Sequence, residues 1–397
     1  MTLVDRTEAA PAKVARLILI LSLAPTVGLG IGRFAYSLLL PDMRDCLAWS
    51  YSAAGFMNTV NAAGYLVGAL ITSRLVQRFG LSAIVRAGTL ACVLSLAACA
   101  ASGNFVLLSA ARLIAGIGAA LAFVAGGALA TILAQTQPAR SAFLLSLFYA
   151  GPGIGILSSG LIVPFLVQAA GPGSWWIGWL VLAALAAAMT LPVLLAPLDS
   201  HATMSGEMPA SFRVRPVLIY LAGYFMFGAG YIAYMTFMIA YVRDAGGGAA
   251  AQSAFWSLIG CSAFVTPWVW RRVMALHRGG LSTTIILTVN AIGAALPLFG
   301  LSPLMLGISA LVFGVSFFAV VASTTAFVRL NYSQAEWPGA IAAMTISFGI
   351  GQTLGPLVVG AITDAIGSLS SALAVSAATL ALGALLSAFQ RPLPRRN

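Results

Sequence analysis

The chain has 397 residues, of which 60% are hydrophobic and only 7% carry a charged side chain. Soluble globular domains contain about 25% charged residues and about 45 to 50% apolar ones. The composition therefore excludes an ordinary soluble enzyme, a nucleic-acid-binding domain and a secreted disulfide scaffold. The formal net charge of +11 raises a different question, which is where each cation lies relative to a bilayer.

Twelve apolar stretches reach the length of about 20 residues that a helix needs to cross a bilayer. The first is interpreted as a retained span that ends at Pro41, because it shows no convincing small-residue cleavage pattern. Short connections make neighbouring helices antiparallel, and an even number of crossings puts both termini on one side of the membrane. The expected spans begin near Leu17, Ala53, Ser82, Phe105, Ala142, Trp175, Pro216, Ala251, Ser282, Leu304, Ile341 and Ser371.

The distribution of Lys and Arg predicts the side on which the termini lie. With both termini in the cytoplasm, sixteen of the 20 Lys and Arg residues lie at cytoplasmic ends of the spans. Only Arg44 and Arg243 then lie at outer ends. Such an excess is typical of cytoplasmic loops. We therefore expect a multi-pass protein of a bacterial inner membrane with both termini cytoplasmic, and the basic charge indicates no nucleic-acid partner.

The cysteines and histidines give no sign of a metal or a cofactor. Cys92, Cys99 and Cys261 lie within expected spans, whereas Cys46 stands alone in an outer loop. This pattern predicts no disulfide, no metal site and no cofactor. Catalysis would need a nucleophile with its base or a metal cluster, and neither a His nor a deep carboxylate lies within the spans to form one. The sequence therefore predicts a protein that is not an enzyme.

The two halves of the chain resemble each other. Residues 30–36 of the first span correspond to residues 228–234 of the seventh, and the Gly-Pro pair at 151–152 corresponds to the pair at 355–356. The landmarks keep the same order in both halves, which indicates a duplicated six-span unit. Parallel repeats of this kind are typical of transporters, whose substrate site lies between the repeats near the middle of the membrane.

The longest hydrophilic stretch lies at the middle of the chain and separates six expected spans from six more. We predict an all-α membrane protein in which twelve transmembrane helices form two pseudo-symmetric bundles of six. The N-terminal bundle is expected at residues 1–197, a cytoplasmic linker at 198–215 and the C-terminal bundle at 216–397.

Several short segments resemble motifs of the major facilitator superfamily. Residues 108–120 contain an Arg followed by small residues, like the fourth-span motif, and residues 149–155 resemble the fifth-span Gly-Pro motif without its full form. Residues 73–82 occupy the place of the signature loop between spans two and three, but Gln77 stands where an Asp is usual. Residues 30–41 resemble, more narrowly, the YbfB/YjiJ-like branch, whose members are mostly known as predicted transporters.

The resemblance covers essentially the whole chain and implies a major facilitator fold in which spans one, four, seven and ten line a central cavity. In the family the loop between spans two and three latches one conformation through a charge relay, and Gln77 departs from the pattern on which that relay depends. The Gly-Pro pairs are expected to kink their spans as the cavity changes sides. The residues assigned to gating or conformational change are Gly151, Pro152, Gly355, Pro356, Arg78 and Gly80.

Arg33 and Arg112 are the only cations expected within spans. Each lies eight residues from the expected outer end of its span, at a depth of about 12 Å. A charge at the centre of a span costs about 2.5 to 3.5 kcal/mol and marks a transport pathway by default. No Asp or Glu is expected deep in any span. Because the donors of Arg match a carboxylate or a phosphate, an anionic cargo is predicted to neutralise the pair.

Structural roles are the alternative for these polar residues. Arg112 could bond backbone carbonyls beside Gly116, Gly118 or the Gly-Pro pair at 151–152, or take part in gating or proton transfer. Arg33 could reach the outer surface or a neighbouring carbonyl. The candidate cavity amides, for which hydrogen bonds between helices are the alternative use, are Asn58, Asn61, Asn290 and Gln352.

Span seven carries a stripe of aromatic residues at spacings of three, four or seven, which places them on one helical face. Aromatic rings with polar tips suit a cavity that holds an organic anion. For the terminal members Tyr220 and Tyr241, a place in the membrane interface or in helix packing is the alternative. The predicted substrate-binding residues are Arg33, Arg112, Tyr231, Tyr36, Tyr234, Tyr224 and Tyr149.

These observations predict a monomeric secondary transporter that moves a small organic anion of carboxylate type by alternating access. Its partners are the substrate, the lipid bilayer and, in one version, protons. Coupling to protons and anion exchange both remain open, with Asp42 and Asp364 as candidate coupling residues. The alternatives are an exporter of hydrophobic or drug-like compounds and a membrane receptor that does not transport.

Overall fold

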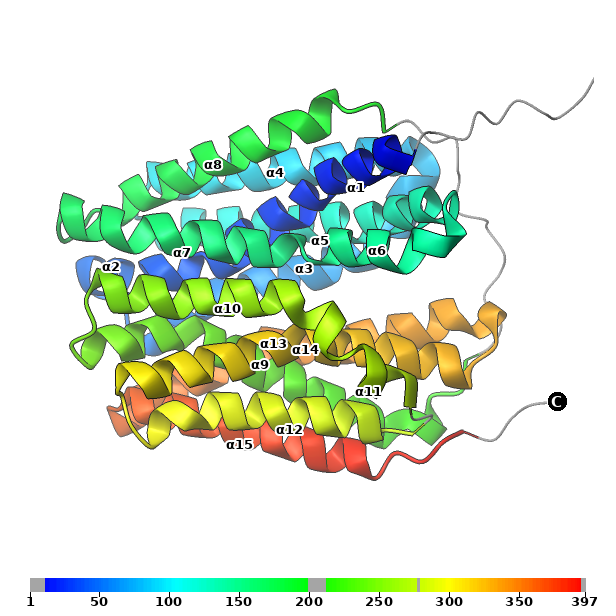
Figure 1. Ribbon diagram of the computed structural model, residues 1–397. Helices are drawn as coiled ribbons and strands as arrows, with labels where there is room; N and C mark the ends of the chain where they lie inside the picture. Colours follow the sequence, from blue (N-terminus) through cyan, green and yellow to red (C-terminus); the bar gives the residue numbers. More distant parts are fainter. Residues whose placement is uncertain (1–10, 199–211, 277–278, 394–397) are drawn as a thin grey trace, which may run out of the picture.

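The computed structural model describes residues 11–198, 212–276 and 279–393 (Figure 1). Within these ranges the secondary structure is entirely helical. In chain order the helices are α1 (Pro11–Pro25), η1 (Thr26–Phe34), α2 (Tyr36–Cys46), α3 (Tyr51–Phe79), α4 (Leu81–Ala101), α5 (Phe105–Gln135), η2 (Pro138–Arg140), α6 (Ser141–Tyr149), α7 (Gly151–Ala170), α8 (Trp175–Leu195), η3 (Arg215–Val217), α9 (Leu218–Asp244), α10 (Ala249–Val269), α11 (Arg271–Leu276), α12 (Leu281–Ala295), η4 (Leu296–Leu298), α13 (Pro303–Asn331), η5 (Gln334–Glu336), α14 (Trp337–Ile366) and α15 (Leu369–Ala388).

Twelve helical segments in the described part of the chain are long and apolar enough to cross a membrane. The predicted number of spans is therefore confirmed. The predicted end of the first span at Pro41 is wrong, because this span runs from Ala12 to Cys46 with Pro41 inside α2. Transmembrane helices tolerate an internal proline where neighbouring groups satisfy the freed backbone. Arg33 consequently lies 46 − 33 = 13 residues from the end of its span, about 20 Å along the helix axis.

The helices form two groups that follow the order of the chain. Helices α1 to α8 lie together in the upper part of Figure 1, and α9 to α15 lie together in the lower part. The first and last described residues lie at the same end of the bundle, which we call the proximal face. The opposite end, with the connections at 47–50, 102–104, 171–174, 245–248 and 367–368, is called the distal face. Most of the predicted linker, residues 199–211, falls outside the described residues.

The middle of the first span is a π-helix, η1, whose nine residues are all buried. Its glycines allow neighbouring helices to approach closely. A Cβ atom on Gly30 would lie 2.6 Å from the Cα atom of Gly155 and 2.6 Å from the carbonyl oxygen of Pro152. The wider turn of a π-helix is frequent at functional sites. This backbone, packed against α7, fixes the position of Arg33 near the centre of the protein.

We expect Gly30→Ala to destabilise the protein, because the added methyl group forces η1 and α7 apart. Overpacking of this kind costs about 1 to 3 kcal/mol. The measurement is the midpoint of thermal unfolding in detergent. Gly248→Ala is the matched control, because Gly248 has negative φ and nothing within 4 Å of an added Cβ. Equal midpoints for the two variants would contradict the close packing of η1.

Candidate central binding site

A cavity of about 50 Å³ lies between the two halves of the chain. Its walls come from η1, α3 and α5 of the first half and from α9, α13 and α14 of the second. Eight of its eleven lining residues are aromatic, and one carries a charge. The lining residues are Leu29, Arg33, Phe34, Tyr65, Phe123, Phe227, Tyr231, Phe317, Phe318, Val321 and Phe348.

Arg33 is the charged residue of this cavity, and its side chain is 2% exposed. Its Nη2 atom donates a hydrogen bond to Oε1 of Gln352 at 2.5 Å. The hydroxyl of Tyr231 donates to the same amide oxygen at 3.2 Å. Among the described residues, no Asp or Glu forms an ion pair with Arg33. The structure thus joins Arg33 and Tyr231, both predicted from the sequence, through one neutral oxygen.

Two hydrogen-bond donors of this cluster find no acceptor in the part of the chain that the structure describes. They are Nε of Arg33 and Nε2 of Gln352, both buried. A buried donor without an acceptor costs about 1 to 3 kcal/mol, so such groups call for a physical reason. Both unpaired donors belong to residues joined by a direct hydrogen bond. The cluster therefore has unused capacity to bind a ligand with acceptor oxygens.

Arg112 lies in α5 and is only 1% exposed, but it is absent from the lining of the cavity. Its Nη1 donates to the carbonyl oxygen of Gly32 at 2.6 Å. Its Nη2 donates to the carbonyl oxygen of Arg33 at 3.3 Å and to Oδ1 of Asn58 at 3.0 Å. The oxygens of Gly32 and Arg33 are backbone carbonyls at the end of η1, where a π-helix leaves acceptors to satisfy. The contacts match the structural alternative for Arg112, although the carbonyls belong to span one.

The amide of Asn58 extends this network into the second half of the chain. Its Nδ2 donates to Oγ1 of Thr236 in α9 at 2.7 Å. Asn61, one turn further along α3, donates to the carbonyl oxygen of Arg112 at 3.0 Å. Asn58 and Asn61, two of the four predicted cavity amides, therefore form hydrogen bonds between helices.

The other predicted tyrosines lie outside the cavity lining. Tyr36 is fully buried and donates to the carbonyl oxygen of Ala54 at 2.8 Å, while Tyr234 pairs with the hydroxyl of Ser309 at 2.8 Å. Tyr224 is buried and stacks on Phe348, a cavity residue, with centroids 5.0 Å apart. These contacts indicate packing for Tyr36 and Tyr234 and a supporting position behind the wall for Tyr224.

Tyr149 differs from the other candidates because its side chain is 45% exposed. It ends α6, and its ring packs edge-on against Phe123 with centroids 5.8 Å apart. Most of the cavity wall was not predicted from the sequence. Its Phe residues carry no signal that separates them from other aromatic residues of the spans, and only the aromatic face of α9 gave a periodic pattern.

Polar contacts close the distal face between the two halves. The carboxylate of Asp364, at the end of α14, accepts hydrogen bonds from the backbone N–H of Tyr51 at 2.7 Å and of Ser52 at 2.9 Å. It also accepts from the Ser52 hydroxyl at 2.6 Å. Arg243 of α9 forms an ion pair with Asp45 of α2 at 2.7 Å. A negative charge at a helix N-terminus is favourable, so Asp364 stabilises the first turn of α3 from the other half.

Asp42 makes a similar contact within one half. Its carboxylate accepts from the backbone N–H groups of Gly173 and Trp175, both at 2.8 Å, at the start of α8. This position suits a capping role. A coupling role for Asp42 or Asp364 stays a prediction.

We expect Asp364→Asn to favour opening of the distal face. An amide keeps one acceptor oxygen but turns its NH2 group toward the N–H donors of α3. Because Asp364 is exposed, the loss should be about 1 kcal/mol, or about a fivefold change in population. Electron paramagnetic resonance between labels at Ala101 and Leu301, two exposed distal positions, measures the opening as a longer distance.

The background for these labels carries Ser in place of the exposed cysteines Cys46 and Cys261. Asp42→Asn is the matched control, because it weakens a cap inside one half and should leave the distance unchanged. An unchanged distance distribution in Asp364→Asn would show that this carboxylate does not hold the halves together.

The predicted gating residues occupy two kinds of position. Gly151 begins α7 after a break at Ala150, and its carbonyl oxygen accepts from the Thr26 hydroxyl at 2.8 Å. The pair at 355–356 instead lies inside the continuous helix α14. At the proximal face Gly80 has φ +83° between α3 and α4, and Arg78 is exposed. Their roles in gating stay predictions.

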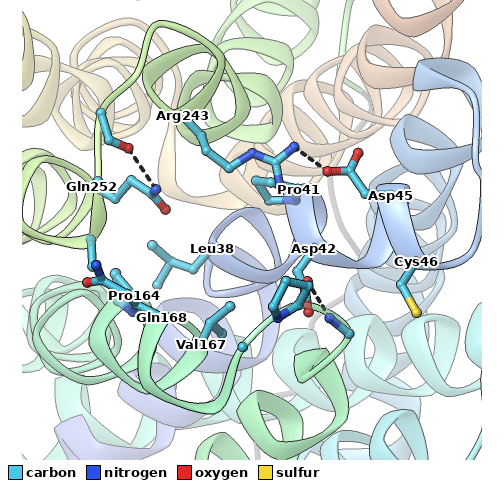
Figure 2. Close-up of a pocket in the computed structure, with 16 residues that line it drawn as sticks. Leu38, Pro41, Asp42, Asp45, Cys46, Pro164, Val167, Gln168, Arg243 and Gln252 are labelled. Atoms are coloured by element: carbon cyan, nitrogen blue, oxygen red, sulfur yellow. Dashed lines mark hydrogen bonds and ion pairs between the residues drawn. The ribbon is translucent and has the colours of Figure 1, made fainter.

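A second, larger hollow of about 590 Å³ opens at the distal face between the halves (Figure 2). The ion pair between Arg243 and Asp45 lies at its edge, and Asp42 borders it beside the start of α8. Its apolar side is formed by Leu38, Pro41, Pro164 and Val167. The hollow therefore borders the ion pair that joins the two halves at the distal face.

Comparisons with known proteins agree with this arrangement. Residues 25–388 match the protein family described as "Uncharacterised MFS-type transporter YbfB". The chain is 33% identical over 154 residues to "Efflux pump radE" of Floropilus chiversii, which covers 38% of this chain and 27% of that protein. The chain thus spans about a quarter of the length of this relative.

The fold is similar to the crystal structure of a mutant of the nucleoside transporter NupG. The TM-score is 0.73 with 14% sequence identity, and the match covers 94% of this chain and 98% of that chain. At this identity the likeness concerns the fold alone.

Proposed function

Because the chain belongs to the major facilitator superfamily of transporters, in the YbfB family, we propose that it is a secondary transporter of a small organic anion. The observation that carries the proposal is the buried guanidinium of Arg33, whose described acceptor is the neutral oxygen of Gln352. An uncompensated charge within a membrane protein is costly and marks a substrate pathway by default. A carboxylate on the cargo supplies the missing charge.

The unpaired donors support an oxygen ligand in particular. A carboxylate accepts up to about four hydrogen bonds through two oxygens. Nε of Arg33 and Nε2 of Gln352 would both find acceptors on it, with one donor from each half of the chain. Donors from both halves would then converge on one ligand, so its presence favours the state in which the halves meet around it.

Arg112 takes a different part in this proposal from the one that the sequence favoured. Its guanidinium is engaged by the carbonyl oxygens of Gly32 and Arg33 and by Asn58. It therefore acts as a positioning residue that holds the backbone of η1, and Arg33 alone meets the cargo.

Alternating access then follows from the relation between the two halves. The hydrogen bonds described between the halves lie at the distal face and near the cavity, which corresponds to a carrier closed on its distal side. The excess of Lys and Arg at the proximal ends of the spans favours a cytoplasmic proximal face in a bacterial inner membrane. Proton coupling and anion exchange are both compatible with these contacts between the halves.

Export of hydrophobic compounds is the second candidate. It is favoured by the similarity to an efflux pump over 154 residues and by the aromatic walls of the cavity. An exporter of uncharged compounds would use the aromatic rings without needing the charge of Arg33.

Thermal unfolding of the purified protein in the presence of candidate ligands tests the proposal. Carboxylates, phosphates, sulfonates and uncharged drugs are compared on the natural protein and on Arg33→Gln. We expect one class of anion to raise the unfolding midpoint of the natural protein and to lose at least tenfold in affinity in the variant. Arg74→Gln, an exposed proximal change, is the matched control. Stabilisation by uncharged drugs alone, equal in both proteins, would establish the exporter instead.

A further inference from the structure

We infer that the cargo of the central site is a flat aromatic ring carrying a single carboxylate, an inference that rests on the proposed function and makes it more specific. The first ground is the composition of the wall. Eight aromatic side chains surround Arg33, together with two aliphatic ones. The polar groups of this wall are the guanidinium of Arg33 and the hydroxyls of Tyr65 and Tyr231, and the remainder is apolar. Gln352, which bonds Arg33 and Tyr231, lies outside the lining. A ligand that fits has one charged end and an apolar body.

The second ground is the orientation of the rings. Phe227, Tyr231 and Phe348 lie nearly parallel, with interplanar angles of 18°, 13° and 20° and centroids 4.9 to 5.7 Å apart. Phe317 is also nearly parallel to Tyr231, at 19° and 6.2 Å. Offset stacking between aromatic rings is favourable beyond the area that it buries. A flat ring beside this stack gains that contact, whereas a puckered aliphatic ring does not.

The third ground is the charge. Arg33 is the single charged residue of the lining. Arg112 lies outside the lining, and its two terminal nitrogens donate to η1 and Asn58. One buried cation balances one anionic group. A second carboxylate on the ligand would lie among aromatic rings without a partner, which is strongly unfavourable in a site of low polarity. The site therefore favours monoanions over dianions.

The size of the cavity indicates how a ring is accommodated. Its volume of about 50 Å³ is smaller than the roughly 150 Å³ of an engineered cavity that binds benzene. A bound ring must therefore displace part of the wall. Four of the wall rings are only half-buried and can turn aside: Tyr65, Phe123, Phe318 and Phe348.

Equilibrium binding of five small ligands tests the inference. Benzoate is compared with cyclohexanecarboxylate, which keeps the charge but is not flat, with acetate, with the dianion phthalate and with uncharged benzamide. We expect benzoate to bind at least tenfold more tightly than each of the others. Phe348→Leu should remove most of the difference between benzoate and cyclohexanecarboxylate. Phe299→Leu, on an 80% exposed distal residue, is the matched control and should leave it unchanged.

The outcomes separate this inference from the proposed function. If benzoate and cyclohexanecarboxylate bind equally and both depend on Arg33, the anion carrier stands and the aromatic cargo is wrong. Tighter binding of phthalate than of benzoate would overturn the inference that the cargo carries a single charge. If none of the carboxylates binds, or if Arg33→Gln leaves their affinities unchanged, the proposed function itself fails. If benzamide binds as tightly as benzoate, the negative charge of the ligand does not contribute to binding, which also contradicts the proposed function.

Discussion

Replacing Gln352 by Glu should abolish anion binding while leaving the protein folded. The new carboxylate would stand at the position of the amide oxygen that now accepts from Arg33 at 2.5 Å, so the guanidinium would acquire a permanent counter-charge. An incoming anion would then meet a like charge. At a separation of about 4 Å and an effective dielectric constant of 20, this repulsion is about 4 kcal/mol, or two to three orders of magnitude in affinity.

Ligand-induced shifts of the thermal unfolding midpoint measure this effect, and the unfolding midpoint of the empty variant reports on folding. We expect that midpoint to be unchanged or higher, because the buried cation gains a partner. Gln135→Glu makes the same chemical change at an exposed position at the end of α5 and should bind as the natural protein does. Normal anion binding by Gln352→Glu would show that the cargo does not meet Arg33.

Replacing Arg112 by Gln should destabilise the protein strongly, in contrast to the same change at Arg33. Arg112 holds two carbonyl oxygens at the end of η1 and the amide of Asn58. Its removal leaves several buried polar groups without partners, at about 1 to 3 kcal/mol each. A total loss of about 3 to 5 kcal/mol is expected, as for other broken buried charge networks. Thermal unfolding in detergent without ligand measures it.

The pair of variants forms its own control. Arg33→Gln removes a guanidinium whose described acceptor is one side-chain oxygen, so its unfolding midpoint should stay near that of the natural protein. The unfolding midpoint of Arg112→Lys should lie between those of Arg112→Gln and the natural protein, because Lys keeps the charge but lacks the fork of donors. If Arg112→Gln unfolds like the natural protein and instead loses anion affinity, Arg112 contacts the cargo as the sequence first indicated.

The spans could be predicted from the sequence because a bilayer imposes their length and composition on every helix. Local backbone geometry could not. The small and apolar residues from Thr26 to Phe34 would suit an α-helix as well as the π-helix that they form. The close packing of α7 against the glycines of this segment is a tertiary effect, which the local sequence does not show. The continuation of α2 through Pro41 has the same origin, since tertiary surroundings decide whether a proline ends a helix.

The candidate site shows the same division between chemistry and position. Their charge identified Arg33 and Arg112 in the sequence, because charged residues within membrane spans are costly and therefore rare. Sequence could not predict that their contacts differ, since these depend on which carbonyls lie within reach. Gln352 was noted only as one amide among four, because nothing along the chain indicates that it meets a cation 319 residues away.

The ion pair between Arg243 and Asp45 gives the carrier a dependence on its surroundings. Both side chains are accessible, at 30% and 55%, and they border a hollow that opens at the distal face. Dissolved salt shortens the range of such an attraction to about 8 Å at physiological strength and to about 3 Å at 1 M. The ion pair should therefore hold the distal face closed more firmly at low ionic strength than at high ionic strength. We therefore expect the salt concentration on the distal side of the membrane to change how firmly this face is closed, even in the absence of cargo.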